Sequence, residues 1–459
     1  MAGLDGVLNR VDAQLDHSLE RLFAFLKIPS ISTDPAHAAE CRRAAEWAAG
    51  QLTDLGLTAA VRETAGHPVV LGRTDTGAAR RVLFYGHYDV QPVDPLDLWD
   101  SPPFEPKLAQ GPTGAKRIVA RGACDDKGQV LTFLEALRAH RDVNGRLPVD
   151  VTILLEGEEE CGSPSLPAFL AAHAGELAAD VALVCDTGMW DRTTPAITTA
   201  LRGILHCELT VSGADRDLHS GLFGGAARNP THVVAQIVAD LHDAKGHVTL
   251  PGFYDAVREP TPEVRRQWEE LSFTAESFLG PVGLSIPAGE ADRMLIEMVQ
   301  SRPTAEVNGM FGGYTGQGSK TIIPASATAK ISFRLVADQD PAAIKAAFAD
   351  FVKARVPADC KLALHFGEGA SAMMVPSDNP DLKKAADALA AEWGKPPVEI
   401  GSGGSIPILG QFKAVIGVDT LLIGFGLDDD RVHSPNEKYD LNCFHKGTRS
   451  WVRILDALA

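Results

Sequence analysis

The sequence predicts an α/β fold in which a mostly parallel sheet, flanked by helices, is interrupted by a smaller α+β domain. Residues 81–85, 149–155 and 181–185 are short, continuous apolar runs, which are typical of strands buried on both faces of a parallel sheet. Residues 128–140 lie between two of these runs and have the periodicity of an amphipathic helix. Strands that alternate with helices are characteristic of the α/β class.

The other elements of this α/β domain follow from the same patterns. Residues 37–55 have helical periodicity, and Gly56 is a typical helix end. In the helix predicted at 128–140, the apolar residues spaced i, i+3, i+4 and i+7 lie on one face; they are Val130, Phe133, Leu134 and Leu137. From about residue 380, the segment DLKKAADALAAEWG predicts another helix, and residues 420–426 predict another buried strand.

The pattern changes near Arg202. Residues 203–213 and 328–337 alternate between apolar and polar side chains, as half-exposed strands do, and helical stretches and Gly/Pro-rich turns separate them. This block is expected to be α+β with an antiparallel sheet. Because 459 residues are too many for a single core, we expect one α/β domain built from residues 1–203 and 379–459, with a smaller domain inserted at 204–378.

The composition excludes several classes of protein. The formal net charge is −17, with 43 Lys+Arg against 60 Asp+Glu, whereas a nucleic-acid-binding protein normally has the opposite balance. A membrane protein is not expected, because no basic run, no signal-peptide pattern and no stretch of roughly 18 apolar residues is present. The seven Cys residues are scattered and form no CxxC pair, which predicts free thiols in the reducing cytoplasm.

Potential metal ligands follow each of the buried strands. Sites in open α/β sheets form beyond the carboxyl ends of the strands. A single His after a strand is more often structural, but four strand ends that all supply His or carboxylate indicate a site. In chain order the residues are His87 and Asp89, then Glu158, Glu159 and Glu160, then Asp186, and finally His433 in a polar loop.

Asp125 and Asp126 precede the helix predicted at 128–140. An N-cap with a first-turn acid explains one of these carboxylates and explains the second less well. Imidazole and carboxylate ligands without thiolate suit zinc, manganese or cobalt. Five such ligands exceed the three that a catalytic zinc takes, and suit two ions that share a bridging carboxylate. Two dications would also neutralise the acidic run at 156–160 and leave one Glu as a general base; the alternative is a solvated acidic loop.

Nine motifs resemble the co-catalytic metallopeptidases that include carnosinases, cytosolic non-specific dipeptidases, glutamate carboxypeptidase, and the acetylornithine and succinyl-diaminopimelate deacylases. They occur in family order between residues 84 and 438, and DLHSG, SKTIIP and GGSIP are most similar to the dipeptidase branch. The motifs are FYGHYDVQP, RGACDDKG, LEGEEECGS, CDTGMW, DLHSGLFGG, GQGSKTIIP, SFRLV, GGSIPIL and VHSPNEK.

The resemblance implies a role for each matching residue at the metals. Asp125 would bridge the two ions, and its peptide bond to Asp126 is expected to be cis. Glu159 would be the general base, and Asp89 would orient a ligating His. The remaining ligands implied by the resemblance are His87 and Asp186 for one ion and Glu160 and His433 for the other.

The inserted segment resembles the family's lid and dimerisation domain. The resemblance implies a homodimer in which His219 of the DLHSG motif reaches into the partner's site. Arg334 and Thr321 resemble residues that hold the substrate's terminal carboxylate. The resemblance further implies a substrate pocket lined by Gly404 and Ser405, with Asn308 as another residue of that wall. His365 lies where some dipeptidases have a further pocket His, but its surroundings depart from the family pattern.

The expected activity is metal-dependent hydrolysis of the peptide bond in dipeptides or other short peptides with a free C-terminal carboxylate. Two divalent ions are expected, with zinc as the first choice by ligand type and manganese or cobalt as alternatives. A deacylase or carboxypeptidase acting on N-acyl amino acids could use the same metals, and a metal-binding protein without activity is a remote alternative. A serine hydrolase is not expected, because GSGGSIP is not G-x-S-x-G. The segment GYTGQGSKT departs from P-loop spacing by one residue.

Overall fold

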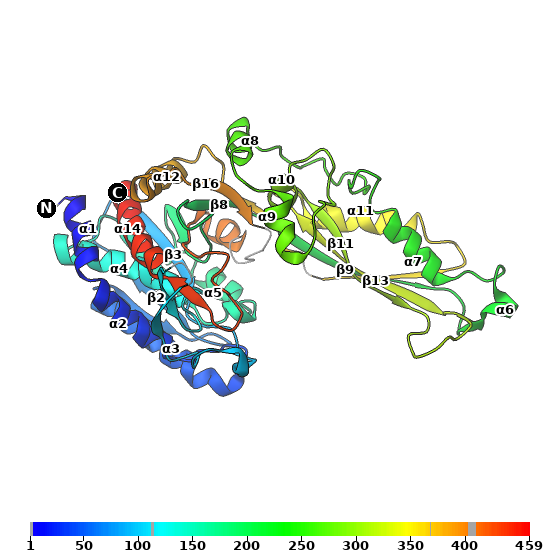
Figure 1. The fold of residues 1–459 in the computed structure, drawn as a ribbon, viewed down its shortest axis with the longest axis horizontal. Coiled ribbons are helices and arrows are strands. Elements are labelled where there is room, and N and C mark those ends of the chain that lie inside the picture. The colour runs from blue at the N-terminus through cyan, green and yellow to red at the C-terminus, as the bar shows by residue number, and fades with distance from the viewer. Residues whose placement is uncertain (1–2, 112–113, 368, 403–409) are drawn as a thin grey trace. The chain divides into compact units, whose positions relative to one another are not determined.

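The computed structural model of the chain describes residues 3–111, 114–367, 369–402 and 410–459 (Figure 1). The chain forms two compact units. The first unit comprises Met1–Thr199, Val375–Ile400 and Gln411–Ala459, and the second comprises Ala200–Met374 and Gly401–Gly410. None of the helices among the described residues is both long enough and apolar enough to cross a membrane.

The first unit is built on a mixed sheet whose central strands are parallel. β3 pairs in parallel with both β6 and β7, and β17 pairs in parallel with β7, so the predicted α/β class with a mostly parallel sheet is confirmed. In spatial order the strands are β1 (Thr58–Arg62), β2 (Val69–Arg73), β6 (Asp150–Glu156), β3 (Arg81–His87), β7 (Val181–Val184), β17 (Thr420–Leu422) and β8 (Ala196–Leu201), with β16 (Val398–Ser402) paired to β8.

Helices cover both faces of this sheet, as the continuous apolar runs predict. Phe84 stacks on Phe133 of α4, with ring centroids 3.8 Å apart, and Trp451 of α14 meets Phe133 edge-on at 5.4 Å. The next residue along β3, Tyr85, points to the opposite face, where it meets Phe412 at 5.4 Å. The helices of this unit are α1 (Leu4–Ala13), α2 (Leu15–Leu26), α3 (Ala38–Asp54), α4 (Lys127–Asn144), α5 (Leu166–His173), α12 (Pro380–Trp393) and α14 (Leu441–Leu458).

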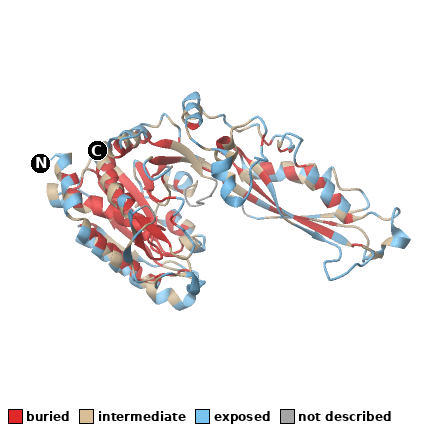
Figure 2. Cartoon of the chain, viewed as in Figure 1, coloured by how far each residue is buried: buried red, intermediate tan, exposed pale blue. Residues whose placement is uncertain are grey.

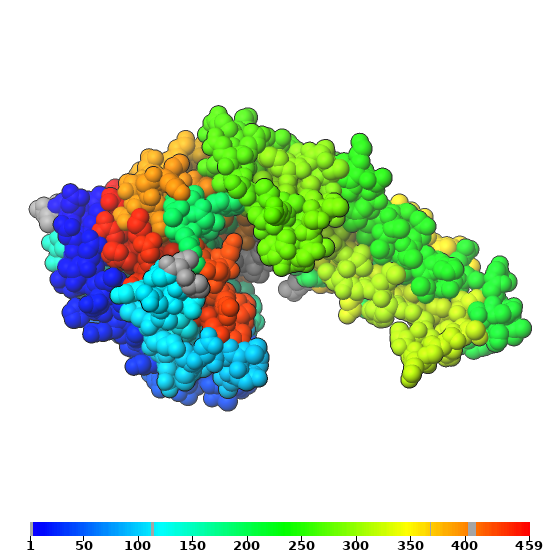
Figure 3. Space-filling model, in the orientation of Figure 1, coloured from blue at the N-terminus to red at the C-terminus, as the bar shows by residue number. Residues whose placement is uncertain are grey.

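The first and last helices, α1 and α14, lie side by side in the first unit, in blue and red in Figure 3. Asp12 of α1 forms ion pairs with both His445 and Arg449 of α14, each at 2.8 Å. A small antiparallel sheet completes the unit; it consists of β18 (Lys438–Asp440), β5 (Lys116–Val119) and β4 (Lys107–Gln110). β18 follows the loop that carries His433, so this small sheet fixes the C-terminal end of that loop.

The strand predicted at 420–426 is shorter in the structure, where β17 ends at Leu422. The chain continues alongside β7, because the amide of Ile423 donates to the carbonyl of Val184 at 2.9 Å. Gly424 then lies so close to Thr187 that a Cβ atom there would be 1.9 Å from the Thr187 carbonyl oxygen. This close approach requires glycine and ends the regular pairing of the strand.

The second unit has a four-stranded antiparallel sheet, as the alternating pattern predicts. Along β9, the residues Leu205, Cys207, Leu209 and Val211 are buried while their neighbours are more exposed. Figure 2 shows buried segments along the long strands of this unit. Phe333 of β13 packs on Phe348 of α11, with centroids 5.0 Å apart. The sheet consists of β11 (Thr304–Gly312), β13 (Ser326–Leu335), β9 (Gly203–Ser212) and β14 (Lys361–Phe366), in that order.

The remaining elements of the second unit are short, apart from two helices that pack on the sheet. Those two helices are α7 (Pro230–Ala239) and α11 (Pro341–Lys353). Strands β10 (Leu218–His219) and β12 (Ile322–Ile323) form a separate pair, and β15 (Met373–Met374) pairs with the end of β8. The short helices are α6 (Ser220–Phe223), α8 (Pro262–Glu269), α9 (Ala275–Leu279) and α10 (Leu295–Gln300).

Candidate metal centre

The first group of potential ligands forms where β3 and β7 end. His87 is the last residue of β3 and is fully buried, and Asp186 follows β7. The Nε2 atom of His87 lies 3.9 Å from Oδ2 of Asp186. Glu159, which follows β6, completes the group, and one ligand atom from each of the three residues lies within 4.8 Å of the others. Parallel strands therefore bring together three residues that are far apart in the sequence.

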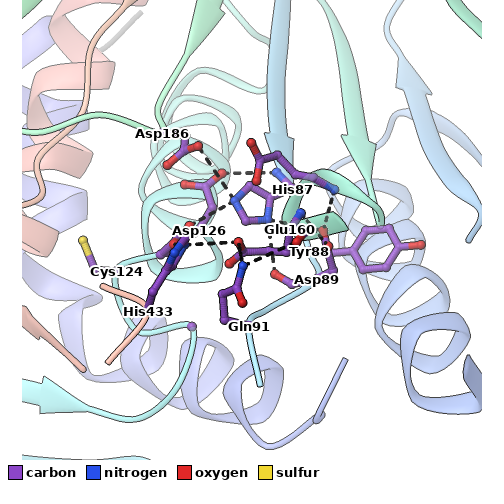
Figure 4. A network of polar contacts seen from close by, with 12 residues as sticks. His87, Tyr88, Asp89, Gln91, Cys124, Asp126, Glu160, Asp186 and His433 are labelled. Carbon is purple, nitrogen blue, oxygen red and sulfur yellow. Dashed lines mark hydrogen bonds and ion pairs between the residues drawn. The ribbon is translucent and has the colours of Figure 1, made fainter. Parts of the chain in front are cut away.

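A second group adjoins the first and consists of Asp125, Glu160 and His433. The Nε2 atom of His433 lies 2.9 Å from Oδ2 of Asp125 and 3.2 Å from Oε2 of Glu160 (Figure 4). The other oxygen of Asp125, Oδ1, lies 3.1 Å from Nε2 of His87. The Asp125 carboxylate is thus placed between the imidazoles of the two groups, and the Asp125–Asp126 peptide bond is cis, as expected.

Asp89 lies behind both groups and is fully buried. Its Oδ1 is 3.3 Å from Nδ1 of His87, so the ring's other nitrogen, Nε2, faces Asp125 and Asp186. The same carboxylate accepts hydrogen bonds from the backbone amides of Glu159 at 3.3 Å and Glu160 at 3.1 Å. Asp89 therefore fixes both the orientation of His87 and the start of the turn that carries the two glutamates.

Asp126 occupies the N-cap position of α4, but its side chain does not cap the helix. Its Oδ2 instead accepts a hydrogen bond from the backbone amide of His87 at 3.2 Å, and the thiol of Cys185 donates to Oδ1 at 3.4 Å. Burial raises the pKa of Asp126 to about 8. Asp126 therefore stands at the N-cap position, as the N-cap explanation expects, but its side chain does not make the hydrogen bond of an N-cap.

The acidic run at 156–160 is divided among different partners. Glu156 accepts hydrogen bonds from the hydroxyls of Tyr85 and Ser163, and burial raises its pKa to about 8. Glu158 turns away from the groups and accepts from the backbone amides of His67 at 3.0 Å and Ser165 at 3.1 Å. Of the four glutamates, only Glu159 and Glu160 contribute to the two groups.

The charge balance of the two groups fits divalent cations. Together they contain four carboxylates and two imidazoles. Burial and the neighbouring Asp125 raise the pKa of Asp186, and burial raises the pKa of Glu159. Burial also opposes ionisation of Asp125, but hydrogen bonds from His433 and His87 hold its pKa below its ordinary value. Carboxylates this close can all be ionised only where positive charge lies among them, and oxygen and imidazole donors are those that zinc and manganese accept.

A third group of potential ligands, in the second unit, does not fit a cation equally well. It consists of His247, Glu290 and Asp292. Arg302 already supplies positive charge there, since its Nε donates to Oε2 of Glu290 at 2.8 Å. The two nitrogens of His247 lie 3.2 Å from Asp243 and 3.0 Å from Asp292, which is the arrangement of a protonated imidazole between two carboxylates.

Those predicted substrate-binding residues that the structure describes belong to the second unit, as does His219. His219 and Thr321 lie together, because His219 pairs with Ile322 in the β10–β12 ladder and Ser220 donates its amide to the carbonyl of Thr321 at 3.0 Å. The Nδ1 atom of His219 accepts from the amide of Gly221 at 3.0 Å, and its ring is exposed. These contacts place His219 at the N-terminus of α6, with Nε2 directed away from that bond.

Arg334 and Asn308 lie on the four-stranded sheet instead. Arg334 is half-buried at the end of β13, opposite Thr304. Asn308 is exposed at the irregularity in β11, between Val307 and Gly309. Gly404 and Ser405 lie outside the described residues, so the predicted Gly-Ser wall has no structural account.

Sequence analysis missed two residues that contact the groups directly or through the backbone. Gln91 donates from Nε2 to Oε2 of Glu160 at 2.7 Å. Glu437 accepts from the backbone amide of Asp125 at 3.0 Å. Both lie within motifs that carry the resemblance, FYGHYDVQP and VHSPNEK, and their position next to predicted ligands was the available signal.

A mostly parallel sheet with imidazole and carboxylate groups gathered beyond its strand ends defines a metal-dependent hydrolase. Residues 83–457 match Peptidase family M20/M25/M40, and the chain belongs to this family. It is a metallopeptidase, and the predicted relationship to carnosinase-like dipeptidases is confirmed.

Three relatives illustrate the similarity. A Cys-Gly metallodipeptidase of Schizosaccharomyces pombe is 30% identical over 99% of this chain and 98% of its own length. The crystal structure of human carnosine dipeptidase 1 matches 100% of this chain and 99% of its own, with a TM-score of 0.75 and 27% identity. The M20 metallo-carboxypeptidase Sso-CP2 of Sulfolobus solfataricus covers 96% of this chain and 98% of its own, with a TM-score of 0.78 and 32% identity.

Proposed function

We propose that this metallopeptidase hydrolyses the peptide bond of dipeptides and other short peptides that have a free C-terminal carboxylate, using two divalent metal ions. One observation carries the proposal: the Asp125 carboxylate lies between His87 and His433, each of which belongs to its own group of ligands. Two adjoining groups that share one carboxylate suit two ions better than one. The names of the Schizosaccharomyces pombe and human relatives support dipeptides as the substrate class.

Five residues would hold the ions, and the two groups of side chains support their division between the two ions. His87 and Asp186 would hold one ion, Glu160 and His433 the other, and Asp125 would be shared. Zinc suits these donors, as do manganese and cobalt. When bound, such ions would lower the pKa of a water molecule so that it yields hydroxide near neutral pH, and would polarise the substrate carbonyl.

Glu159 is the residue that we assign as the general base. Its carboxylate lies with His87 and Asp186, and its backbone amide is held by Asp89 at 3.3 Å. It would accept a proton from the attacking water and deliver that proton to the leaving amine. Asp89 would keep the His87 ring in the orientation that presents Nε2 to the site.

The inserted domain at 204–378 would supply most of the substrate contacts, while residues 1–203 and 379–459 would form the catalytic domain. Arg334 would bind the terminal carboxylate through charge-assisted hydrogen bonds, with Thr321 as a second donor. Gly404, Ser405 and Asn308 would form the wall of the pocket. This arrangement would restrict substrates to short peptides whose C-terminus is free.

We further propose that the functional unit is a homodimer in which His219 of one protomer donates to the oxyanion formed in its partner. The ring of His219 is exposed and its Nδ1 accepts from a backbone amide, so Nε2 carries the proton that such a donor requires. A cytoplasmic location is supported by the free cysteines, since all seven are unpaired.

The substrate class is tested by assaying the metal-reconstituted protein against a mixed dipeptide library that also contains N-acyl amino acids and longer peptides. Release of free amino acids from dipeptides is the expected result. The similarity to Sso-CP2 favours carboxypeptidase activity as the second candidate, and that activity predicts faster hydrolysis of longer peptides. Turnover of N-acyl amino acids without turnover of dipeptides would overturn the dipeptidase assignment.

A further inference from the structure

Glu437 is a fully buried carboxylate that belongs to neither group of proposed metal ligands. Its Oε2 accepts from Nη1 of Arg121 at 2.7 Å and from the amide of Gly122 at 2.9 Å. Its Oε1 accepts from the amides of Cys124 at 2.9 Å and Asp125 at 3.0 Å. Two hydrogen bonds to each oxygen use the accepting capacity of the carboxylate.

Arg121, its partner, is also buried and extends the contact to another segment. Nη2 of Arg121 donates to the carbonyl of Pro92 at 2.9 Å, and its guanidinium lies 5.5 Å from the centre of the Trp99 ring. Pro92 follows His87 and Asp89 by a few residues in the chain. The buried Arg121–Glu437 pair is thus bonded to the segment that leaves β3.

The pair therefore joins three segments that carry proposed ligands. They are the segment after β3 with His87, the segment before α4 with Asp125, and the loop with His433, from which Glu437 itself comes. His433 has a left-handed backbone conformation, with φ at 61°, which a non-glycine residue adopts only where its surroundings hold it. Glu437 lies four residues after His433 and accepts a hydrogen bond from the backbone amide of Asp125, so it links the His433 loop to the Asp125 segment.

We propose that Glu437, together with Arg121, is a positioning residue that sets the spacing between Asp125 and His433, and through it the affinity for the ion that these two residues share with Glu160. The inference rests on the proposed two-metal function and adds to it a residue that contacts no ion. The ion of the other group, held by His87 and Asp186, depends less on this spacing, since Asp125 is the only one of its proposed ligands whose backbone amide donates to Glu437.

The chain offers a matched control in Asp150. It is a buried carboxylate that accepts from the backbone amides of Thr76, Gly77 and Ala78 at 2.8–3.2 Å. It also lies 3.7 Å from Nη2 of Arg81. Asp150 begins β6, whose other end is Glu156, so it lies about 20 Å of strand away from the proposed ligands. Like Glu437, it is a buried carboxylate that accepts from backbone amides near an arginine, but it lies far from the proposed ligands.

The experiment compares Glu437→Gln with Asp150→Asn in the full chain. Each change replaces a carboxylate oxygen, which accepts from backbone amides, by an NH₂ group. The NH₂ group is itself a donor, so it cannot accept the hydrogen bond of the amide that faces it. We would measure zinc affinity of the metal-free protein by competition with a chelating indicator, zinc per chain by elemental analysis, and thermal unfolding of the metal-free protein. Loss of a residue that orients ligands typically lowers metal affinity by about 10–100-fold.

The expected result is a biphasic zinc titration for Glu437→Gln, with one site weakened about 10–100-fold and the other nearly unchanged. Asp150→Asn should lower the unfolding temperature and leave both affinities as in wild type. Wild-type affinities in Glu437→Gln, or equal losses in both variants, would overturn the positioning role. If Glu437→Gln does not fold, Glu437→Asp, which withdraws the carboxylate by one methylene, takes its place with the same expectations.

The same titration separates this inference from the proposed function. A wild-type chain that binds two zinc ions, with Glu437→Gln unchanged, would overturn only the positioning role. A wild-type chain that binds one ion or none would overturn the two-metal function. Because affinity rather than turnover is measured, the identity of the substrate does not enter the result.

Discussion

Glu159 and Glu160 are neighbours in the sequence, but their carboxylates belong to different groups: Glu159 lies with His87 and Asp186, and Glu160 lies with Asp125 and His433. The turn between them is part of a 3₁₀ helix, and both backbone amides donate to Asp89. Anchoring the two amides on one buried carboxylate lets adjacent side chains diverge. Two glutamates that look equivalent in the sequence are therefore expected to fail in different ways.

Glu159→Gln should keep the metal and lose turnover, because the change removes the proposed base and leaves the proposed ligands. The expected loss of kcat is about 10²–10⁴-fold. Glu160→Gln should instead lower metal content, because it removes a charged ligand. Metal analysis and steady-state kinetics on both variants check this, and the opposite pattern would show that the roles of the two residues are exchanged.

Removal of metal should abolish activity and lower stability together. The carboxylates of the two groups are close and partly or fully buried, so without cations they repel one another. A chelator should stop hydrolysis, and zinc, manganese or cobalt should restore it. Each site filled at a hundred times its Kd should add about 2.7 kcal/mol of stability, which calorimetry would detect as a higher unfolding temperature. Fewer than two ions per active chain would contradict the two-metal assignment.

Mixing two inactive variants should restore activity if His219 acts across a dimer. His219→Ala lacks the proposed oxyanion donor and Glu159→Gln lacks the base. A mixed dimer would contain one site that lacks both groups and one site that is intact, so activity should reappear on mixing. Tags on the two variants would verify that mixed dimers form. Mixed dimers without activity would show that His219 does not serve the partner's site.

Acidification should destabilise the protein in part through His140, which is buried between α4 and α14. Burial lowers its pKa below the ordinary value of about 6.5, and its Nε2 lies 3.2 Å from the carbonyl of Val452. As the pH falls below about 6.5, the unfolded chain binds a proton there that the folded chain does not, so stability is lost by up to about 1.4 kcal/mol per pH unit.

The variant His140→Gln keeps an N–H donor for Val452 but cannot titrate. Its free energy of unfolding should therefore fall less than that of the wild type between pH 7 and pH 5. Urea unfolding of the metal-free proteins at both pH values measures the difference and cancels the contribution of the metal ligands. Equal losses in both proteins would show that His140 does not contribute.

The central sheet was predictable because burial on both faces leaves a plain record in the sequence. Phe84 and Tyr85 contact opposite faces, and a strand that must be apolar on both sides appears as a continuous run. The ligand candidates were predictable for a related reason, since parallel strands end at one edge and the residues that follow them must meet there. Their roles stay predictions.

Other features depend on contacts that no local pattern encodes. The early end of β17 results from the close approach of Gly424 to Thr187. The side chain of Asp126 accepts hydrogen bonds from His87 and Cys185 instead of capping its own helix. Glu437 contacts residues more than 300 positions away in the chain. A single carboxylate in a polar loop carries no periodic signal, so only the fold identifies its partners.

The order of the strands has a consequence for the growing polypeptide on the ribosome. β17 lies between β7 and β8 in the sheet, but it is translated after both of them. Until it emerges, the two older strands have no neighbour on that side, and neither His433 nor Glu437 exists to close the second group. Occupation of the second group by metal should therefore follow completion of the sheet. A chain stalled before residue 420 would also expose the apolar flank of β7.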